Sequence, residues 1–247
     1  MAETEVPELF IDSPLHELIL PFERQALSIL AVKDPWSSLA FNPGDPQHDV
    51  YWGEVWPAAV TLAEAILCKE ISIPGGEDAV LDIGCGTGLV TVAAAIAAGP
   101  GTRILAGDRE LRALDLTMEN ARRNEVSERV SVEQIDWAKE YPRRHRLIFA
   151  ADCLYHANGG WPLAHFIARA LDPDPAAQGR AIVVDPDRWT ARNFKFLAQE
   201  AGFNVRTYTR AIPFLAAQGP IREVPVLDLH RDIRKTIEAN FYELTFA

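Results

Sequence analysis

One glycine-rich stretch constrains the fold of this chain more than any other part of the sequence. Residues 81–88 read Leu-Asp-Ile-Gly-Cys-Gly-Thr-Gly, after a short apolar run at 79–83 and before an alanine-rich apolar run at 89–98. Three glycines at alternate positions let the backbone turn tightly and come close to a ligand, and the N-terminus of the following helix points at that ligand. The pattern therefore predicts a strand, a ligand-binding loop and a helix in succession.

The same alternation of strands and helices continues along the chain. Hydrophobic periodicity and turn signals predict further helices at 110–124, 162–171 and 189–201. This order implies right-handed βαβ units and a mostly parallel sheet, with the ligand site at the carboxyl ends of the strands. We therefore expect an α/β fold with a three-layer, Rossmann-like, seven-stranded sheet. The strands are predicted at 79–83, 103–106, 130–135, 146–151, 180–184, 204–209 and 242–246.

The N-terminal part does not follow this alternation. Six prolines interrupt residues 1–49, which we predict to be an irregular extension of the same domain with one helix around 22–32. Residues 50–247 are predicted to form the α/β domain itself, although 211–239 show no clear pattern. A helix is expected to begin at Pro57, because the missing N–H of proline is not needed in a first turn.

Acidic residues stand at the ends of three successive predicted strands. Asp82 precedes the glycine loop, where a carboxylate repels a pyrophosphate but suits a cation such as an amino group. Asp108, 20 residues beyond Gly88, can accept hydrogen bonds from both hydroxyls of a ribose. Asp136 and the backbone N–H of Trp137 can read an adenine edge. The set points away from NAD and towards S-adenosylmethionine, whose methionine end carries an ammonium group. In the alternative interpretation, the glycines form only a turn and the carboxylates lie on the surface.

With these residues the sequence resembles the class I, seven-β-strand S-adenosylmethionine-dependent methyltransferases. The resemblance rests on the stretch at 81–88 followed by Asp108 and Asp136. It implies that the last two strands, at 204–209 and 242–246, form the antiparallel pair that ends this fold. It also implies that S-adenosylmethionine is the cofactor.

Three further segments make the resemblance narrower. They are Trp56-Pro57 before a helix, Asp136-Trp137 after the third strand, and Asp152-Cys153-Leu154-Tyr155 after the fourth. Together they are similar to the methyltransferase-like protein-lysine N-methyltransferases, and the match runs over residues 50–187. The resemblance implies methyl transfer to a lysine side chain of a protein substrate. It assigns the cofactor to Trp56, Asp82, Gly84, Gly86, Gly88, Asp108, Asp136 and Trp137.

The same resemblance gives Asp152 and Tyr155 the catalytic positions, at the mouth where the acceptor nitrogen meets the methyl group. We expect Asp152 to capture and orient an incoming ammonium and Tyr155 to shape the channel. A strand cap and a packed ring are the structural alternatives for this pair. The segment Asp185-Pro186-Asp187-Arg188 either faces the acceptor or forms an Asp-Pro turn.

The net charge of the chain indicates which class of partner it can bind. Asp and Glu number 35 against 24 Lys and Arg, which gives a net charge of −11. Such a chain repels phosphate backbones, so a nucleic-acid partner is not expected. The basic run at 143–146 favours a solvated turn but leaves a local nucleic-acid contact open. A basic protein or a cationic small molecule fits better, and a protein substrate is predicted.

No metal site is expected, because the six histidines lack HExxH and paired Cys/His spacing. Three cysteines without a CxxC pair, no signal peptide and no apolar run of ~20 residues favour a soluble cytoplasmic protein. Two other functions stay open. One is a small-molecule methyltransferase with the N-terminal extension as a lid, and the other is a cofactor-binding partner protein without catalysis.

Overall fold

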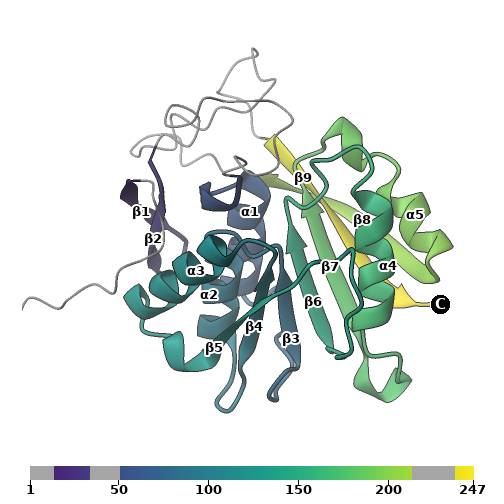
Figure 1. Ribbon diagram of the computed structural model, residues 1–247, viewed down its shortest axis with the longest axis horizontal. Helices are drawn as coiled ribbons and strands as arrows, with labels where there is room; N and C mark the ends of the chain where they lie inside the picture. The colour runs from purple at the N-terminus through teal and green to yellow at the C-terminus, as the bar shows by residue number, and fades with distance from the viewer. Residues whose placement is uncertain (1–13, 34–50, 213–236) are drawn as a thin grey trace, which may run out of the picture.

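The computed structural model describes residues 14–33, 51–212 and 237–247 (Figure 1). The strands of the main sheet span Val80–Ile83 (β3), Ile104–Asp108 (β4), Val130–Gln134 (β5), Leu147–Ala151 (β6), Arg180–Asp185 (β7), Phe203–Ile212 (β8) and Ile237–Phe246 (β9). They form a seven-stranded sheet in the order β5-β4-β3-β6-β7-β9-β8. Strands β3 to β7 pair in parallel, whereas β9 runs antiparallel to both β7 and β8. The predicted Rossmann-like sheet and its antiparallel final pair are confirmed.

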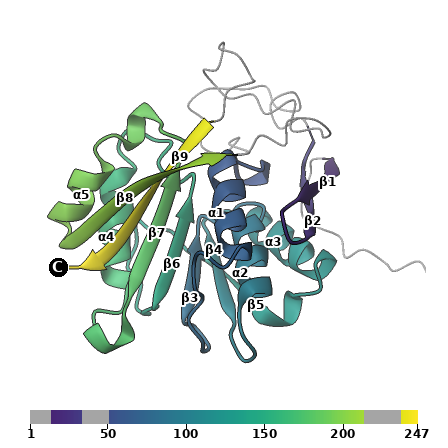
Figure 2. The ribbon, with the colours of Figure 1, turned by 180° about the vertical axis from the view of Figure 1, so that it is seen from behind.

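Helices cover both faces of this sheet, as Figures 1 and 2 show. They span Pro57–Leu67 (α1), Leu89–Ala97 (α2), Leu111–Arg123 (α3), Gly160–Ala170 (α4) and Phe194–Glu200 (α5). Successive strand residues point to opposite faces, so Phe149 packs with α1 and α2 while its neighbours Ile148 and Ala150 pack with α4 and α5. Both faces of the central strands are therefore buried, which explains their continuous apolar sequence.

Helix α1 begins where the sequence predicts, whereas helix α5 begins later. α1 begins at Pro57, as predicted. α5 is shorter than the predicted helix at 189–201, because Trp189–Ala191 form a separate 3₁₀ turn before it.

The N-terminal region forms a β-hairpin, so the predicted helix at 22–32 is wrong. Leu15–Pro21 (β1) pairs antiparallel with Ala26–Val32 (β2). Burial alternates along β2, with Leu27, Ile29 and Ala31 inside. This is the period of a half-buried strand, and tertiary packing here overrides the helix propensity of leucine and alanine. Residues 15–32 are thus regular, in contrast to the irregular structure expected for them.

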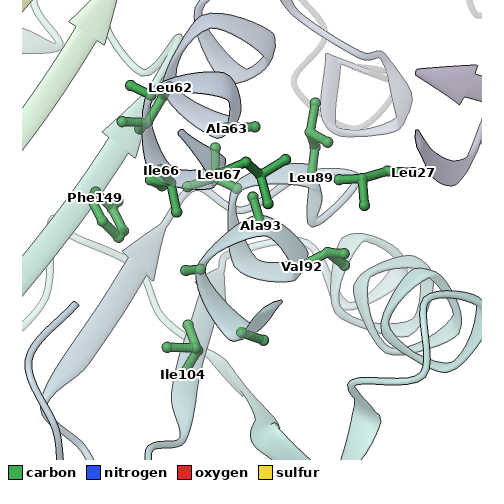
Figure 3. Close-up of a cluster of buried hydrophobic side chains, with 14 of the residues drawn as sticks. Leu27, Leu62, Ala63, Ile66, Leu67, Leu89, Val92, Ala93, Ile104 and Phe149 are labelled. Carbon is green, nitrogen blue, oxygen red and sulfur yellow. The ribbon is translucent and has the colours of Figure 1, made fainter. Parts of the chain in front are cut away.

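The hairpin shares the hydrophobic core that lies between the sheet and α1 and α2. Figure 3 shows Leu27 of β2 reaching towards Leu89 of α2, with Leu62 and Ile66 of α1 between α2 and Phe149 of the sheet. All five side chains are almost completely buried.

Across the described ranges, no helix combines the length and the apolar character needed to cross a membrane.

Leu62 is a direct test of this core. Its side chain is fully buried, whereas Leu111 at the start of α3 is 59% exposed. We expect Leu62→Ala to lower the free energy of unfolding by about 2–5 kcal/mol, because it removes buried methyl groups and leaves a cavity. Leu111→Ala is the matched control and should change it by less than about 0.5 kcal/mol. Urea denaturation of both variants measures the difference, and equal losses would contradict the packing described.

Candidate active site

The glycine loop joins β3 to α2 in a conformation that needs glycine. Gly84, Gly86 and Gly88 have φ values of 69°, 53° and 77°, in the left-handed region. At Gly88, which caps α2, a Cβ atom would lie 2.7 Å from Thr117 Oγ1 and 2.9 Å from Thr117 Cα. Backbone conformation and space both exclude a side chain there.

Asp108, the last residue of β4, organises this loop. Its Oδ2 accepts a hydrogen bond from the Gly86 N–H (3.0 Å) and its Oδ1 accepts one from the Glu110 N–H (3.0 Å). A carboxylate has about four acceptor sites, so capacity remains for further donors such as hydroxyls. Burial raises the pKa of Asp108, and the two backbone hydrogen bonds act in the opposite direction.

Asp82 faces the first turns of α2. It is 1% exposed, and its Oδ2 accepts a hydrogen bond from the Thr91 hydroxyl (2.6 Å). The pKa of Asp82 is raised to about 7, chiefly by burial; the hydrogen bonds from Thr91 oppose this rise and the negative charge of Asp108 adds to it. No cationic side chain of the described residues forms an ion pair with it.

Asp136 and Trp137 follow β5, the strand next to β4 in the sheet. The Asp136 Oδ1 accepts a hydrogen bond from the Ala138 N–H (2.9 Å), and its Oδ2 lies 3.7 Å from Lys139 Nζ. The Trp137 ring lies against Gly84, 3.3 Å from the position of a Cβ there. The indole therefore contacts the glycine loop, while the carboxylate forms a local turn.

Asp152, directly after β6, belongs to a buried ion-pair cluster. It has a φ of 58°, and its Oδ2 accepts a hydrogen bond from the Ala58 N–H at the start of α1 (2.8 Å). Arg188 Nη1 lies 2.5 Å from Asp152 Oδ1 and 2.9 Å from Asp185 Oδ2. Burial raises the pKa of Asp152 to about 6, and the Arg188 guanidinium acts against that rise. Asp185 Oδ1 also accepts from the Arg188 N–H (2.7 Å), so the Asp-Pro turn is formed.

A group of aromatic rings lies next to this cluster. The ring centres of Tyr51 and Trp56 are 5.9 Å apart, and those of Tyr51 and Tyr155 are 5.4 Å apart. Trp56 Nε1 donates to the Tyr51 carbonyl (2.8 Å), and the Arg188 guanidinium lies 5.5 Å from the Trp56 ring centre. Trp56, Asp152 and Tyr155 are thus brought together, although they are distant in sequence.

The glycine loop is in contact with the segments that carry the ion-pair cluster of Asp152, Arg188 and Asp185. The Trp52 carbonyl lies 3.1 Å from the Cβ position of Gly86. The Cys153 thiol donates to the Ile83 carbonyl (3.4 Å) and fills the space beside Gly84. Both groups therefore lie along the carboxyl edge of the parallel strands, where ligands bind in this kind of sheet.

Sequence reasoning did not assign a role to several residues of this edge. Tyr51 and the half-buried Glu54 stand beside the predicted Trp56, and burial raises the pKa of Glu54 to about 7. The sequence indicates Arg188 only as part of a turn or of the acceptor side, because its partner Asp152 is 36 residues away. For Tyr51 and Glu54, the sequence offers one indication of a role, which is their proximity to the predicted residue Trp56. Among the described residues, no group of three or more His, Cys, Asp or Glu could hold a metal ion.

The pKa of Asp82 leads to a pH-dependent stability. Its folded value of about 7 lies above its ordinary value of 3.8, so the folded protein binds this proton more tightly than the unfolded chain. The resulting stabilisation is present at low pH and is lost as the pH rises towards 7. Asp82→Asn keeps the shape and removes the titration. Between pH 5 and 7, wild type should lose up to ~1.4 kcal/mol per pH unit relative to the variant in urea denaturation of the ligand-free protein. Parallel profiles would mean that Asp82 stays ionised when folded.

Comparison with known proteins identifies a family that the chain matches. The chain matches the family model described as "Lysine methyltransferase" over residues 47–199. It is 29% identical over 145 residues to the "Probable cobalt-precorrin-6B C(15)-methyltransferase (decarboxylating)" of Pyrobaculum aerophilum, across 58% of this chain and 70% of that protein. It is 34% identical over 112 residues to the ribosomal protein L11 methyltransferase of Syntrophotalea carbinolica, across 42% of this chain but only 35% of that protein.

A solved structure supports the fold. The chain is similar to an S-adenosylmethionine-dependent methyltransferase from Aquifex aeolicus, with a TM-score of 0.53 and 13% identity, over 74% of this chain and 88% of that one. The family match covers the glycine loop, the strand-end carboxylates and the aromatic group together. The chain therefore belongs to the lysine methyltransferase family, and it is a methyltransferase that uses S-adenosylmethionine.

Proposed function

We propose that the protein methylates the side-chain amine of a lysine in a protein substrate. The observation that carries this proposal is the match to the lysine methyltransferase family over the segment that contains Trp56, Asp152 and Tyr155. The grouping of these residues at the carboxyl edge supports it, because aromatic rings beside a carboxylate suit a long apolar stem with an amine at its end.

The glycine loop and Asp108 fit the cofactor. The protein packs so closely on the loop glycines that none can carry a Cβ, which fixes the course of the loop, and Asp108 keeps acceptor capacity for ribose hydroxyls beside it. We propose that Asp136 and Trp137 hold the adenine, and that Asp82 and Trp56 serve the methionine end. When bound, S-adenosylmethionine supplies an activated methyl group on a positively charged sulfur.

The protein's own task is to present a neutral amine in line with that methyl group. A free lysine has a pKa near 10.4, so its reactive form is scarce at neutral pH. The rings of Tyr51, Trp56 and Tyr155 remove water from the amine, which lowers its pKa. Arg188 offsets the charge of Asp152 and Asp185. The cluster is then less able to hold the acceptor as an ammonium ion.

In this proposal, Asp152 acts by positioning the residues to which it is bonded. Its carboxylate already binds the Ala58 N–H and Arg188, so it fixes the start of α1 and with it Trp56. The direct capture of an incoming ammonium by Asp152 stays a prediction, and Tyr155 is proposed to line the channel.

A small-molecule acceptor is the second candidate. One relative is named as a methyltransferase of cobalt-precorrin-6B, whereas another is named for ribosomal protein L11. We favour the protein acceptor because of the family match. We also propose a cytoplasmic location, since Cys68, Cys85 and Cys153 are all free thiols.

Labelling with a tritiated methyl donor separates the two acceptors. The purified protein is incubated with a lysate of its source organism, and protein and small-molecule fractions are counted separately. We expect a discrete labelled protein band whose hydrolysate contains methyl-lysine. Label confined to the small-molecule fraction would replace the lysine proposal with the second candidate.

Asp152→Asn and Tyr155→Phe test the acceptor side. We expect each to reduce methyl transfer about 10- to 100-fold, because small errors in the position of reacting groups are costly. The affinity for S-adenosylhomocysteine, measured by calorimetry, should change less than about threefold. Asp174→Asn is the control and should alter neither quantity, because this exposed carboxylate lies before the N-terminal end of β7, away from the carboxyl ends of the strands. Equal losses of rate and of affinity would contradict this division of roles.

A further inference from the structure

Asn120 of α3 connects two parts of the chain that are far apart in sequence. It is fully buried, and its amide makes three hydrogen bonds. Nδ2 donates to the Thr87 carbonyl of the glycine loop (2.8 Å) and to the Leu30 carbonyl of β2 (3.0 Å). Oδ1 accepts from the Leu30 N–H (2.7 Å). Both donors of the amide are therefore used, one on the loop and one on the hairpin.

Asn124 makes the same contact with the hairpin but not with the loop. Its Oδ1 accepts from the Ser28 N–H (3.1 Å), and its Nδ2 donates to the Ser28 carbonyl (2.7 Å). Its other donor bond goes to the Asn120 carbonyl in its own helix (2.8 Å). Four residues of helix rise ~6.0 Å and two residues of strand ~6.6 Å, so both amides meet alternate residues of β2. Helix α3 thus pairs with β2 much as another strand would.

A second contact reaches the loop from the same hairpin. Gly53 packs so closely on Val32, the last residue of β2, that no Cβ fits between them. The carbonyl of the neighbouring Trp52 lies against Gly86. On the α3 side, the Thr117 hydroxyl donates to the Gly86 carbonyl (3.2 Å). The carbonyls of Gly86 and Thr87 are therefore held by α3, and the hairpin supports both sides of the loop.

We propose that Asn120 is a positioning residue for the cofactor loop, through which the N-terminal hairpin contributes to cofactor binding. The inference rests on the proposed role of the glycine loop in holding the cofactor. If a ligand holds the loop in place, the Asn120 amide is held as well, and its bonds to Leu30 open less often. The coupling is reciprocal, so loosening the hairpin at Leu30 weakens ligand binding by the same factor.

Paired alanine variants test this inference, with S-adenosylhomocysteine as the probe. Asn120→Ala and Asn124→Ala each remove one amide from the hairpin, but only the first removes the bond to Thr87. We expect Asn120→Ala to weaken binding about tenfold in calorimetry, as for the loss of a buried hydrogen bond. Asn124→Ala should weaken it less than about twofold. Equal effects of the two variants would overturn the inference.

Hydrogen exchange of the wild-type protein gives a test that does not depend on the variants' stability. Saturation with S-adenosylhomocysteine should slow exchange of the Leu30 amide by about tenfold, measured by NMR. Unchanged exchange at Leu30 in a protein that binds the probe would overturn the coupling alone. Failure of the wild type to bind the probe would overturn the proposed cofactor site as well as the coupling.

Discussion

The close approach of α3 to the glycine loop is the constraint on which the site depends. Thr117 leaves no room for a Cβ at Gly88, and Thr117 and Asn120 bind the carbonyls of Gly86 and Thr87. On the opposite side, the Gly86 N–H is directed to Asp108. A backbone held on both sides requires little reorganisation when a ligand binds, so less of the binding free energy is lost in ordering the loop.

Three carboxylates at the strand ends, those of Asp82, Asp108 and Asp152, are buried, but their negative charges are compensated in different ways. Asp108 is stabilised by backbone N–H groups, and Asp152 shares the guanidinium of Arg188 with Asp185. Asp82 has only a hydroxyl as its partner among the described side chains, and burial raises its pKa to about 7. A positive charge brought near Asp82 therefore changes its protonation more readily than that of a carboxylate already paired with arginine.

This distribution separates the two halves of the proposed reaction. On the proposed donor side are the loop, Asp108 and Trp137, within the segment that resembles methyltransferases named for different substrates. On the proposed acceptor side are Tyr51, Tyr155 and the Asp152–Arg188 pair, where aromatic surface and balanced charge favour a desolvated amine, and Trp56 lies between them and the proposed site of the methionine end. Because fold alone does not define a substrate, the lysine proposal depends on the acceptor side and on the family match.

From the amino-acid sequence alone follow the order of strands and helices from Pro57 onwards, the sheet type and the position of the glycine loop. These features depend on local periodicity and on turn residues, which are visible within short windows. Three features become visible only in the folded protein: the strand at 26–32, the pairing of Asp152 with Arg188, and the bridge that Asn120 forms between Leu30 and Thr87. The Asn120 and Leu30 contact spans 90 residues, and no local pattern encodes which distant backbone group a buried amide will meet. Such pairings are set by the packing of whole elements, because each buried polar group must find its partner after the layers have come together.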